Sequence, residues 1–263
     1  MSIKSLKTGR EFLWQGDKSI WAGRSPILFP IVGRAMNDRL KIDGKEYEMT
    51  IHGFARKTEF KLYTQGNDYI EYLLTQNEDT LAKFPYKFNL FVRYTLIENT
   101  LKITYTVENT DEKEICFSIG AHPGFNCKIG DVLEFEKNET LCTQVLNSEH
   151  YRDLQLPYLN NENMIIIDKN TFEHDALVFE NTKSDFIVLK SQIHSYSIKY
   201  NYYNAPFLGI WAKPNAPYVC IEPWFGADDL NGTDYDFSEK PTAMNLSVGN
   251  KFEYSMLIEF SEN

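Results

Sequence analysis

The chain contains few of the residues that covalent cross-links or metal sites require. Its four cysteines are far apart, and no two form a C-x-x-C pair: Cys116, Cys127, Cys142 and Cys220. A disulfide framework is typical of smaller, secreted chains, and a zinc site is typically built from closer ligand pairs. We therefore expect single reduced thiols packed in or near the core, and neither a metal ion nor a cofactor.

Basic residues are outnumbered by acidic residues, 27 to 37, which gives a net charge of −10. A negatively charged surface repels nucleic-acid backbones and anionic lipids, so we expect neither nucleic acid nor a membrane as a partner. Long apolar runs are absent too, because none approaches the roughly 18 residues of a membrane-spanning helix. Residues 1–14 also lack the apolar core of a secretory signal. These features predict a soluble, cytoplasmic protein.

Common catalytic and ligand-binding motifs are also missing. The chain has no G-x-G-x-x-G, Walker A, H-E-x-x-H or G-x-S-x-G motif, which argues against nucleotide, zinc-protease and hydrolase functions. The acidic segment 228–236 could begin a calcium-binding loop, because Glu239 falls where a twelve-residue loop counted from Asp228 would end. However, Leu230 and Gly232 occupy ligand positions, and Thr233 stands where the sharp turn needs glycine. We therefore expect a solvated loop there.

Aromatic residues are abundant, and they accompany a period-two pattern. The 18 Phe, 16 Tyr and 4 Trp make up 14% of the chain, and aromatic side chains favour the pleated, half-buried surface of a sheet. Apolar residues occupy every second position in residues 88–96, 101–108 and 252–260. Because a short turn-forming segment, residues 98–100, separates the first two runs, we predict an antiparallel hairpin.

Shorter apolar segments predict further strands, and one segment predicts a short helix. The strand candidates are residues 45–48, 60–63, 69–74, 177–179, 186–189, 207–211 and 218–221, and the helix candidate is residues 78–83. No low-complexity linker or repeat interrupts the pattern. The sequence therefore predicts an all-β fold, a large antiparallel β-sandwich, with residues 1–263 as a single domain.

Three titratable residues stand out because each follows a predicted strand and precedes a turn with Gly or Pro. His52 precedes Gly53, His122 precedes Pro123, and Glu222 precedes Pro223. Polar side chains at strand ends can converge on a concave sheet. The other histidines have polar neighbours, and we expect them at the surface: His150, His174 and His194.

These fragments, taken together, resemble the aldose 1-epimerase (galactose mutarotase) family, and most closely its branch of shorter bacterial proteins associated with lactose operons. The segments that resemble family motifs are Gly-Arg-Ala-Met-Asn at 33–37, His-Gly-Phe-Ala-Arg at 52–56, His-Pro-Gly-Phe-Asn at 122–126 and Ile-Glu-Pro at 221–223, with Asp175 as the match to a binding aspartate. Each motif is short, and their joint order makes the resemblance specific. Phe54 replaces a second glycine of longer members, and Pro123-Gly124 replaces their Ser-Tyr, which concerns the identity of the substrate more than the type of reaction.

The resemblance implies a galactose mutarotase-like supersandwich that interconverts the α and β anomers of a free aldose without a metal or cofactor. It implies Glu222 as the base and His122 as the acid, since a carboxylate and an imidazole can exchange protons near neutral pH. It also implies sugar-hydroxyl contacts for His52 and Asp175, and a contact of Arg34 with a ring or hydroxyl oxygen.

Three alternatives remain open from the sequence. A glycoside hydrolase would use paired carboxylates, here Glu222 and Asp175. A non-catalytic carbohydrate-binding protein would use the same pocket for recognition alone. A sugar-phosphate 1-epimerase would bind its phosphate through Arg24, Arg39 or Arg56.

Overall fold

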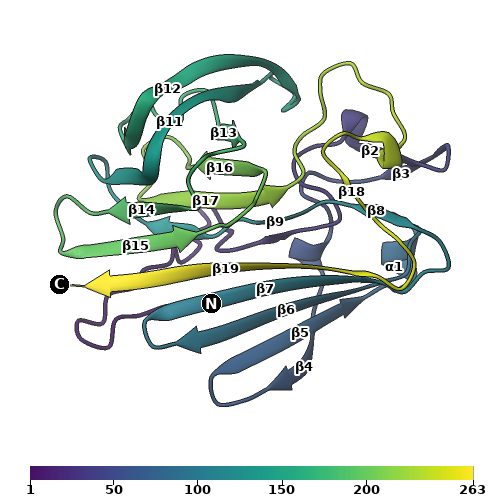
Figure 1. The fold of residues 1–263 in the computed structure, drawn as a ribbon, viewed down its shortest axis with the longest axis horizontal. Coiled ribbons are helices and arrows are strands. Elements are labelled where there is room, and N and C mark those ends of the chain that lie inside the picture. The colour runs from purple at the N-terminus through teal and green to yellow at the C-terminus, as the bar shows by residue number, and fades with distance from the viewer. Residues whose placement is uncertain (263) are drawn as a thin grey trace.

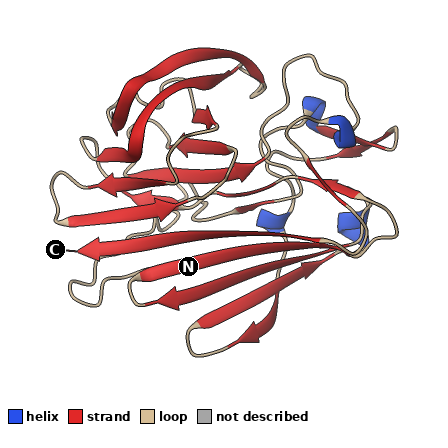
Figure 2. Cartoon of the chain, viewed as in Figure 1, coloured by secondary structure: helices blue, strands red, loops and turns tan. Residues whose placement is uncertain are grey.

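Antiparallel strands form most of the regular structure of the computed structural model, which describes residues 1–262 (Figure 2). The strands are β1 (Ile27–Leu28), β2 (Arg39–Ile42), β3 (Lys45–Glu48), β4 (Lys61–Gln65), β5 (Tyr69–Thr75), β6 (Phe88–Ile97), β7 (Thr100–Asn109), β8 (Ile115–Phe117), β9 (Ile119–Ala121), β10 (Gly124–Asn126), β11 (Val132–Leu146), β12 (Arg152–Ile166), β13 (Leu177–Glu180), β14 (Phe186–Lys190), β15 (Tyr196–Asn201), β16 (Phe207–Trp211), β17 (Tyr218–Phe225), β18 (Met244–Leu246) and β19 (Lys251–Glu262). Helical structure within the described residues is limited to α1 (Glu78–Leu81) and 3₁₀ turns at Met36–Asp38, Ala55–Lys57 and Phe237–Glu239. The all-β prediction is confirmed. No helix in residues 1–262 is long and apolar enough to cross a bilayer.

Fifteen of the strands form one antiparallel sheet. Its order is β1-β9-β17-β16-β13-β11-β14-β15-β19-β7-β6-β5-β4, with β10 added beside β17 and β12 beside β11. Strands β4 to β7 and β19 fan out across the lower half of the molecule, and the long β11–β12 hairpin arches over the top (Figure 1). The strands β17, β16 and β9 therefore lie side by side near one end of the order, and they carry most of the site described below.

The predicted hairpin is present, with its predicted register of apolar residues. Ile97 of β6 pairs with Thr100 of β7, and Glu98 in the turn has a positive φ of 52°. Along β7 the side chains of Ile103, Tyr105 and Val107 are buried. These side chains point to one face, as the period-two pattern predicts.

The β11–β12 hairpin was not predicted. Each strand is 15 residues long, but β12 pairs only with β11, and most of its side chains are exposed. The pairing also shifts register at several positions, among them between Glu134 and Glu139. Because neither face of β12 is continuously buried and bulges break the period, the sequence carries no clean alternation there.

Three of the four cysteines match the expectation of buried free thiols, namely Cys116, Cys127 and Cys220. The expectation is wrong for Cys142, which is exposed on β11 because its side chain points outward from the long hairpin.

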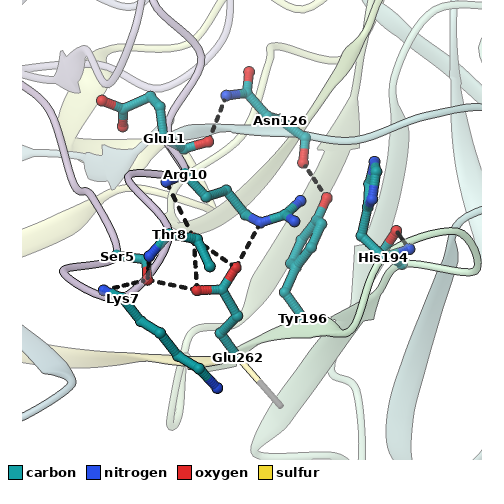
Figure 3. Close-up of polar contacts among 10 residues, drawn as sticks. Ser5, Lys7, Thr8, Arg10, Glu11, Asn126, His194, Tyr196 and Glu262 are labelled. Atoms are coloured by element: carbon teal, nitrogen blue, oxygen red, sulfur yellow. Dashed lines mark hydrogen bonds and ion pairs between the residues drawn. The ribbon is translucent and has the colours of Figure 1, made fainter.

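The two ends of the described chain contact each other (Figure 3). Glu262, at the end of β19, accepts hydrogen bonds from the Ser5 and Thr8 hydroxyl groups, and it pairs with Arg10 Nε at 2.9 Å. These bonds lower the pKa of Glu262 to about 2. Since hydrogen bonds to a carboxylate favour its ionised form, the N-terminal segment is held to the sheet by a charged group.

Candidate active site

Glu222 lies inside β17, in the buried part of the sheet. Its position is opposite Gly209 of β16, and the residue is 1% exposed. The expectation that the strand ends at Glu222 is wrong, because β17 continues through Pro223 to Phe225. Pairing with β16, with Leu208 opposite Pro223, overrides the local effect of the proline. A central strand thus holds the carboxylate on a rigid backbone.

His122 lies in the link between β9 and β10, and it faces Glu222. Its Nδ1 is 3.3 Å from Glu222 Oε1, without the geometry of a full hydrogen bond. The indole ring of Trp21 stacks on the imidazole, with ring centroids 5.1 Å apart at an angle of 26°. The structure therefore brings the predicted acid and the predicted base together.

Burial shifts both groups of this pair toward their neutral forms. It raises the pKa of Glu222 well above its usual value, and the nearby carboxylates of Asp175 and Asp228 add to this rise. It lowers the pKa of His122 to about 3, and the positive charge of Arg56 acts in the same direction. Buried Glu222 Oε2, His122 Nδ1 and Trp224 Nε1 have no hydrogen-bond partner within residues 1–262. Unpaired buried polar atoms are costly, and a polar ligand would satisfy them.

His52 lies in a turn with a positive φ of 62°, and its backbone and side chain are both hydrogen-bonded to Gly33. Its N–H donates to the Gly33 carbonyl at 2.8 Å, and its Nδ1 accepts from the Gly33 N–H at 3.1 Å. Because Nδ1 is an acceptor, the proton of the neutral ring is on Nε2. Burial, assisted by the charges of His122 and Arg56, lowers the pKa of His52 well below 6.5. His52 is therefore a neutral donor through Nε2.

Asp175 contacts His150, a residue that we expected at the surface. Asp175 Oδ2 is 3.0 Å from His150 Nδ1. Asp175 has a positive φ of 72° and lies just before β13, whereas His150 is in the loop between β11 and β12. The side chain of His150 is about half exposed, as expected for a surface residue, and it also lines the cavity.

These groups line one cavity of about 610 Å³, a volume typical of small-ligand sites. Glu222, His122, His52 and Asp175 all line it, and the remaining lining residues include Trp21, Trp211, Trp224, Arg56, His150 and Asp228. Gly209 makes room for one wall, since a Cβ there would lie 2.6 Å from the Trp224 ring. Of the aromatics that follow Glu222, Trp224 faces the cavity, whereas Phe225 packs against Phe252 and Tyr254.

Arg34 is not brought to this cavity. Its guanidinium makes two hydrogen bonds to Asp38, at 2.8 and 2.7 Å, and one to the Glu149 carbonyl at 2.9 Å. It lines an adjoining pocket, and Arg56 lines both this pocket and the main cavity. The contact of Arg34 with substrate stays a prediction, and Arg56 is the guanidinium that the structure places beside the predicted acid and base.

Comparison with known proteins agrees with the resemblance in the motifs. A model of the aldose 1-epimerase family matches residues 1–244. The chain belongs to the aldose 1-epimerase family. A relative from Lactococcus lactis subsp. lactis, "Protein LacX, plasmid", is 32% identical over 242 residues, which are 86% of this chain and 81% of the relative.

Two solved structures share the fold of this aldose 1-epimerase family member over nearly its whole length. One is a galactose mutarotase related enzyme from Lactobacillus acidophilus, with a TM-score of 0.94 and 32% identity, covering 99% of this chain and 90% of the other. The second is a galactose mutarotase-like protein from Lactobacillus casei ATCC 334, with a TM-score of 0.92 and 28% identity, covering 99% and 92%. The galactose mutarotase-like sandwich is thereby confirmed, and the family is one of isomerase-type enzymes acting on small sugars.

The acidic segment of this aldose 1-epimerase family member differs from its predicted state. Asp228 and Asp229, its first two residues, are buried, and Asp229 Oδ1 pairs with the buried Lys240 Nζ at 2.7 Å. The expectation of a solvated loop is therefore wrong for these two residues. The sequence alone could not show this burial, because Lys240 lies beside Asp229 only in the folded chain.

One group of side chains has the composition of a metal site. Ligand-type atoms of His122, Cys220 and Glu222 lie within 4.8 Å of one another. Burial raises the pKa of the Cys220 thiol well above its usual value. A thiol binds metal as the thiolate, so this shift opposes binding at neutral pH.

Proposed function

We propose that the protein is an aldose 1-epimerase that interconverts the α and β anomers of a free aldose by opening and reclosing the pyranose ring. The observation that carries the proposal is the Glu222–His122 pair, buried and unpaired with other groups at the wall of a sugar-sized cavity. Membership in the aldose 1-epimerase family supports it.

The proposed reaction needs two proton transfers. Glu222 removes the proton of the anomeric hydroxyl group, and His122 protonates the ring oxygen as the C1–O5 bond breaks, which leaves a free aldehyde. After rotation about the C1–C2 bond, the ring oxygen attacks the other face of the carbonyl carbon, and the two groups return their protons in reversed roles. Positioned proton transfers of this kind are typically worth about 10²–10⁴-fold each.

The protonation of the pair fits this scheme. Burial disfavours an isolated charge on either group, so the pair holds one proton. With that proton on Glu222 the pair is neutral, and with it on His122 the pair is a carboxylate beside an imidazolium. Both forms have zero net charge, and Nδ1 and Oε1, 3.3 Å apart, need only a small reorientation for the proton to pass between them. The second form is the one that can act as base and acid.

Other cavity residues are suited to hold the sugar. His52 donates through Nε2 to a sugar oxygen, and Asp175 accepts from a hydroxyl group. Three indole rings, of Trp21, Trp211 and Trp224, line the cavity and offer apolar faces to the C–H side of a pyranose. A ring held in this way meets the acid and base in a fixed orientation, which contributes to catalysis.

Polarimetry of freshly dissolved α-glucose and α-galactose tests the proposal. We expect the protein to accelerate the approach of optical rotation to equilibrium. Release of reducing ends from a glycoside would instead indicate a glycoside hydrolase, and saturable sugar binding without faster mutarotation would indicate a binding protein. Either result would overturn the epimerase proposal.

A second candidate function, epimerisation of a sugar phosphate, is favoured by Arg56. Its guanidinium forms no ion pair within the described residues, and burial lowers its pKa from the usual value. It lies with Lys57 where the main cavity meets the adjoining pocket. An unpaired guanidinium can bind a phosphate group. Glucose 6-phosphate in the same polarimetric assay separates the two candidates.

A further inference from the structure

Asp228 is a carboxylate of the cavity that the predicted site does not include. It follows β17 by three residues, lines the same cavity as Glu222 and His52, and is only 4% exposed. A buried carboxylate is costly unless its oxygen atoms are paired or hydrogen-bonded. The partners of its two oxygens therefore show what the residue does.

The first oxygen, Oδ1, has a structural partner in the loop that holds His52. It accepts a hydrogen bond from the Arg34 backbone N–H at 2.7 Å. Gly33, the preceding residue, has a positive φ of 72°, and a Cβ there would lie 2.3 Å from Asp228 Cγ. Because Gly33 also makes both hydrogen bonds to His52, Oδ1 helps to fix the orientation of that imidazole.

The second oxygen, Oδ2, has no such partner. It makes no hydrogen bond to another residue within 1–262, and it is not among the buried side-chain atoms sealed from solvent without a partner. Since Asp228 lines the cavity, a molecule bound in that cavity could donate a hydrogen bond to Oδ2.

Within the described residues, Asp228 also forms no side-chain ion pair with the nearby cations. Lys240 pairs with Asp229 and donates to the Ala227 carbonyl, and Arg152 Nε donates to the backbone carbonyl of Asp228 at 2.8 Å. Burial raises the pKa of Asp228 to about 6, while the Arg34 N–H, Lys240, the residue's own N–H and Arg152 oppose the rise. Above about pH 6 the residue is therefore an ionised hydrogen-bond acceptor.

We propose that Asp228 is a further substrate-binding residue, whose Oδ2 accepts a hydrogen bond from a sugar hydroxyl group. This inference rests on the proposed function, since it assumes that the cavity binds a sugar. It also predicts which substituents of the sugar the two charged residues favour. Asp228 takes a neutral hydroxyl group and repels an anionic substituent, whereas Arg56 attracts one.

Paired variants test the proposal by calorimetric titration with galactose and glucose. Asp228→Asn keeps an oxygen for the Arg34 N–H but replaces Oδ2 by a donor. We expect its sugar Kd to rise about ten- to a hundredfold, the usual loss for a hydrogen bond to a charged group. The matched control is Asp229→Asn, which breaks the Lys240 pair outside the cavity. It should lower the thermal unfolding midpoint and leave the sugar Kd within about twofold of wild type.

Monodeoxy analogues of the bound sugar, each lacking one hydroxyl group, separate direct contact from positioning. One analogue should bind to wild type and to Asp228→Asn with the same Kd, because it lacks the hydroxyl group that donates a hydrogen bond to Oδ2. Equal weakening of every analogue would show that Asp228 acts only through the His52 loop, and an unchanged Kd for the parent sugar would show no contact; either result overturns the proposal. Asp228→Ser is the second variant if Asp228→Asn does not fold. Sugar binding by wild type without faster mutarotation would overturn the epimerase function and leave the Asp228 contact standing.

Discussion

His122 Nδ1 lies 3.3 Å from Glu222 Oε1, although 100 residues of chain separate the two. The contact exists because β17 lies between β9 and β16 in the sheet, so that the link after β9 crosses beside the middle of β17. Each group is buried, and neither has another side chain to neutralise it. The pair is therefore the part of the cavity whose geometry best suits proton transfer to and from a substrate.

Replacing Glu222 by Gln should abolish the base with little change of shape. We expect kcat for mutarotation to fall about 10²-fold or more, on the order of 3 kcal/mol of barrier, with a much smaller change in sugar binding. Polarimetry at saturating sugar measures the effect. Glu139→Gln is the matched control, because Glu139 is equally buried but accepts from Ser184 outside the cavity. A folded Glu222→Gln protein with near-normal kcat would move the base to Asp175.

The two cavity histidines should respond differently to substitution by Asn. His122→Asn removes the proposed acid, so we expect kcat to fall by about 10²-fold or more. His52→Asn removes the Nε2 donor and the bond from Gly33, so both KM and kcat should change through lost positioning. His194→Asn, outside the cavity lining, serves as the control. Identical kinetics for the two cavity variants would contradict the division of roles.

Arg56 should decide whether an anionic substituent is bound. For a sugar phosphate, Arg56→Gln should raise KM about tenfold or more, because a charge-assisted hydrogen bond is lost. For the free sugar the same change should have a small effect. Arg39→Gln is the control, since Arg39 lines the adjoining pocket but is paired with Glu46 at 3.0 Å. Equal kinetic effects on both substrates would exclude phosphate binding at Arg56.

Local alternation predicted several strands that bury one face, but prediction and burial did not always agree. The hairpin β6–β7 has alternating Ile103, Tyr105 and Val107 in the core, and its strands were predicted. The strand β12 is a mostly exposed edge, so its sequence is not constrained to alternate. The strand β15 was missed as well, although Tyr196, Ile198 and Tyr200 are buried on one face, whereas the mostly exposed β3 was predicted. Alternation is therefore a useful but incomplete signal of a strand.

The sequence predicted some residues of the candidate site and missed others. Glu222, His122 and His52 stand in short motifs of Gly, Pro and apolar residues, which the sequence shows. Trp21, His150 and Asp228 reach the cavity only in the folded chain, and their local sequence does not mark them as residues of this site. The neighbourhood of Asp228 contains Lys240 and Arg152, whose proximity depends on the whole sheet.

Mutarotation should not depend on a metal ion. Both proposed proton transfers use side chains, and the thiol of the His122–Cys220–Glu222 group has a raised pKa that disfavours the thiolate. We expect an EDTA-treated protein to retain its full rate by polarimetry. Loss of activity on chelation, restored by one specific cation, would show that these side chains act through a bound metal.

The pH dependence of stability should differ between wild type and Glu222→Gln. The folded-state pKa of Glu222 is raised, so the folded protein keeps a proton that the unfolded chain releases above about pH 4.5. The folded state then binds more protons, and stability falls as pH rises toward the folded-state pKa. His122 acts in the opposite direction, because its folded-state pKa of about 3 lies below its usual value of 6.5, so the protein loses stability as pH falls below 6.5.

Gln cannot ionise. The Glu222→Gln variant should therefore not lose stability as pH rises, but it should still lose stability as pH falls. Urea unfolding at about pH 5 and about pH 8.5 should therefore show a larger advantage for Glu222→Gln at the higher pH. Parallel pH profiles for the two proteins would mean that Glu222 is already ionised in the folded state, and the shared-proton description of the pair would be wrong.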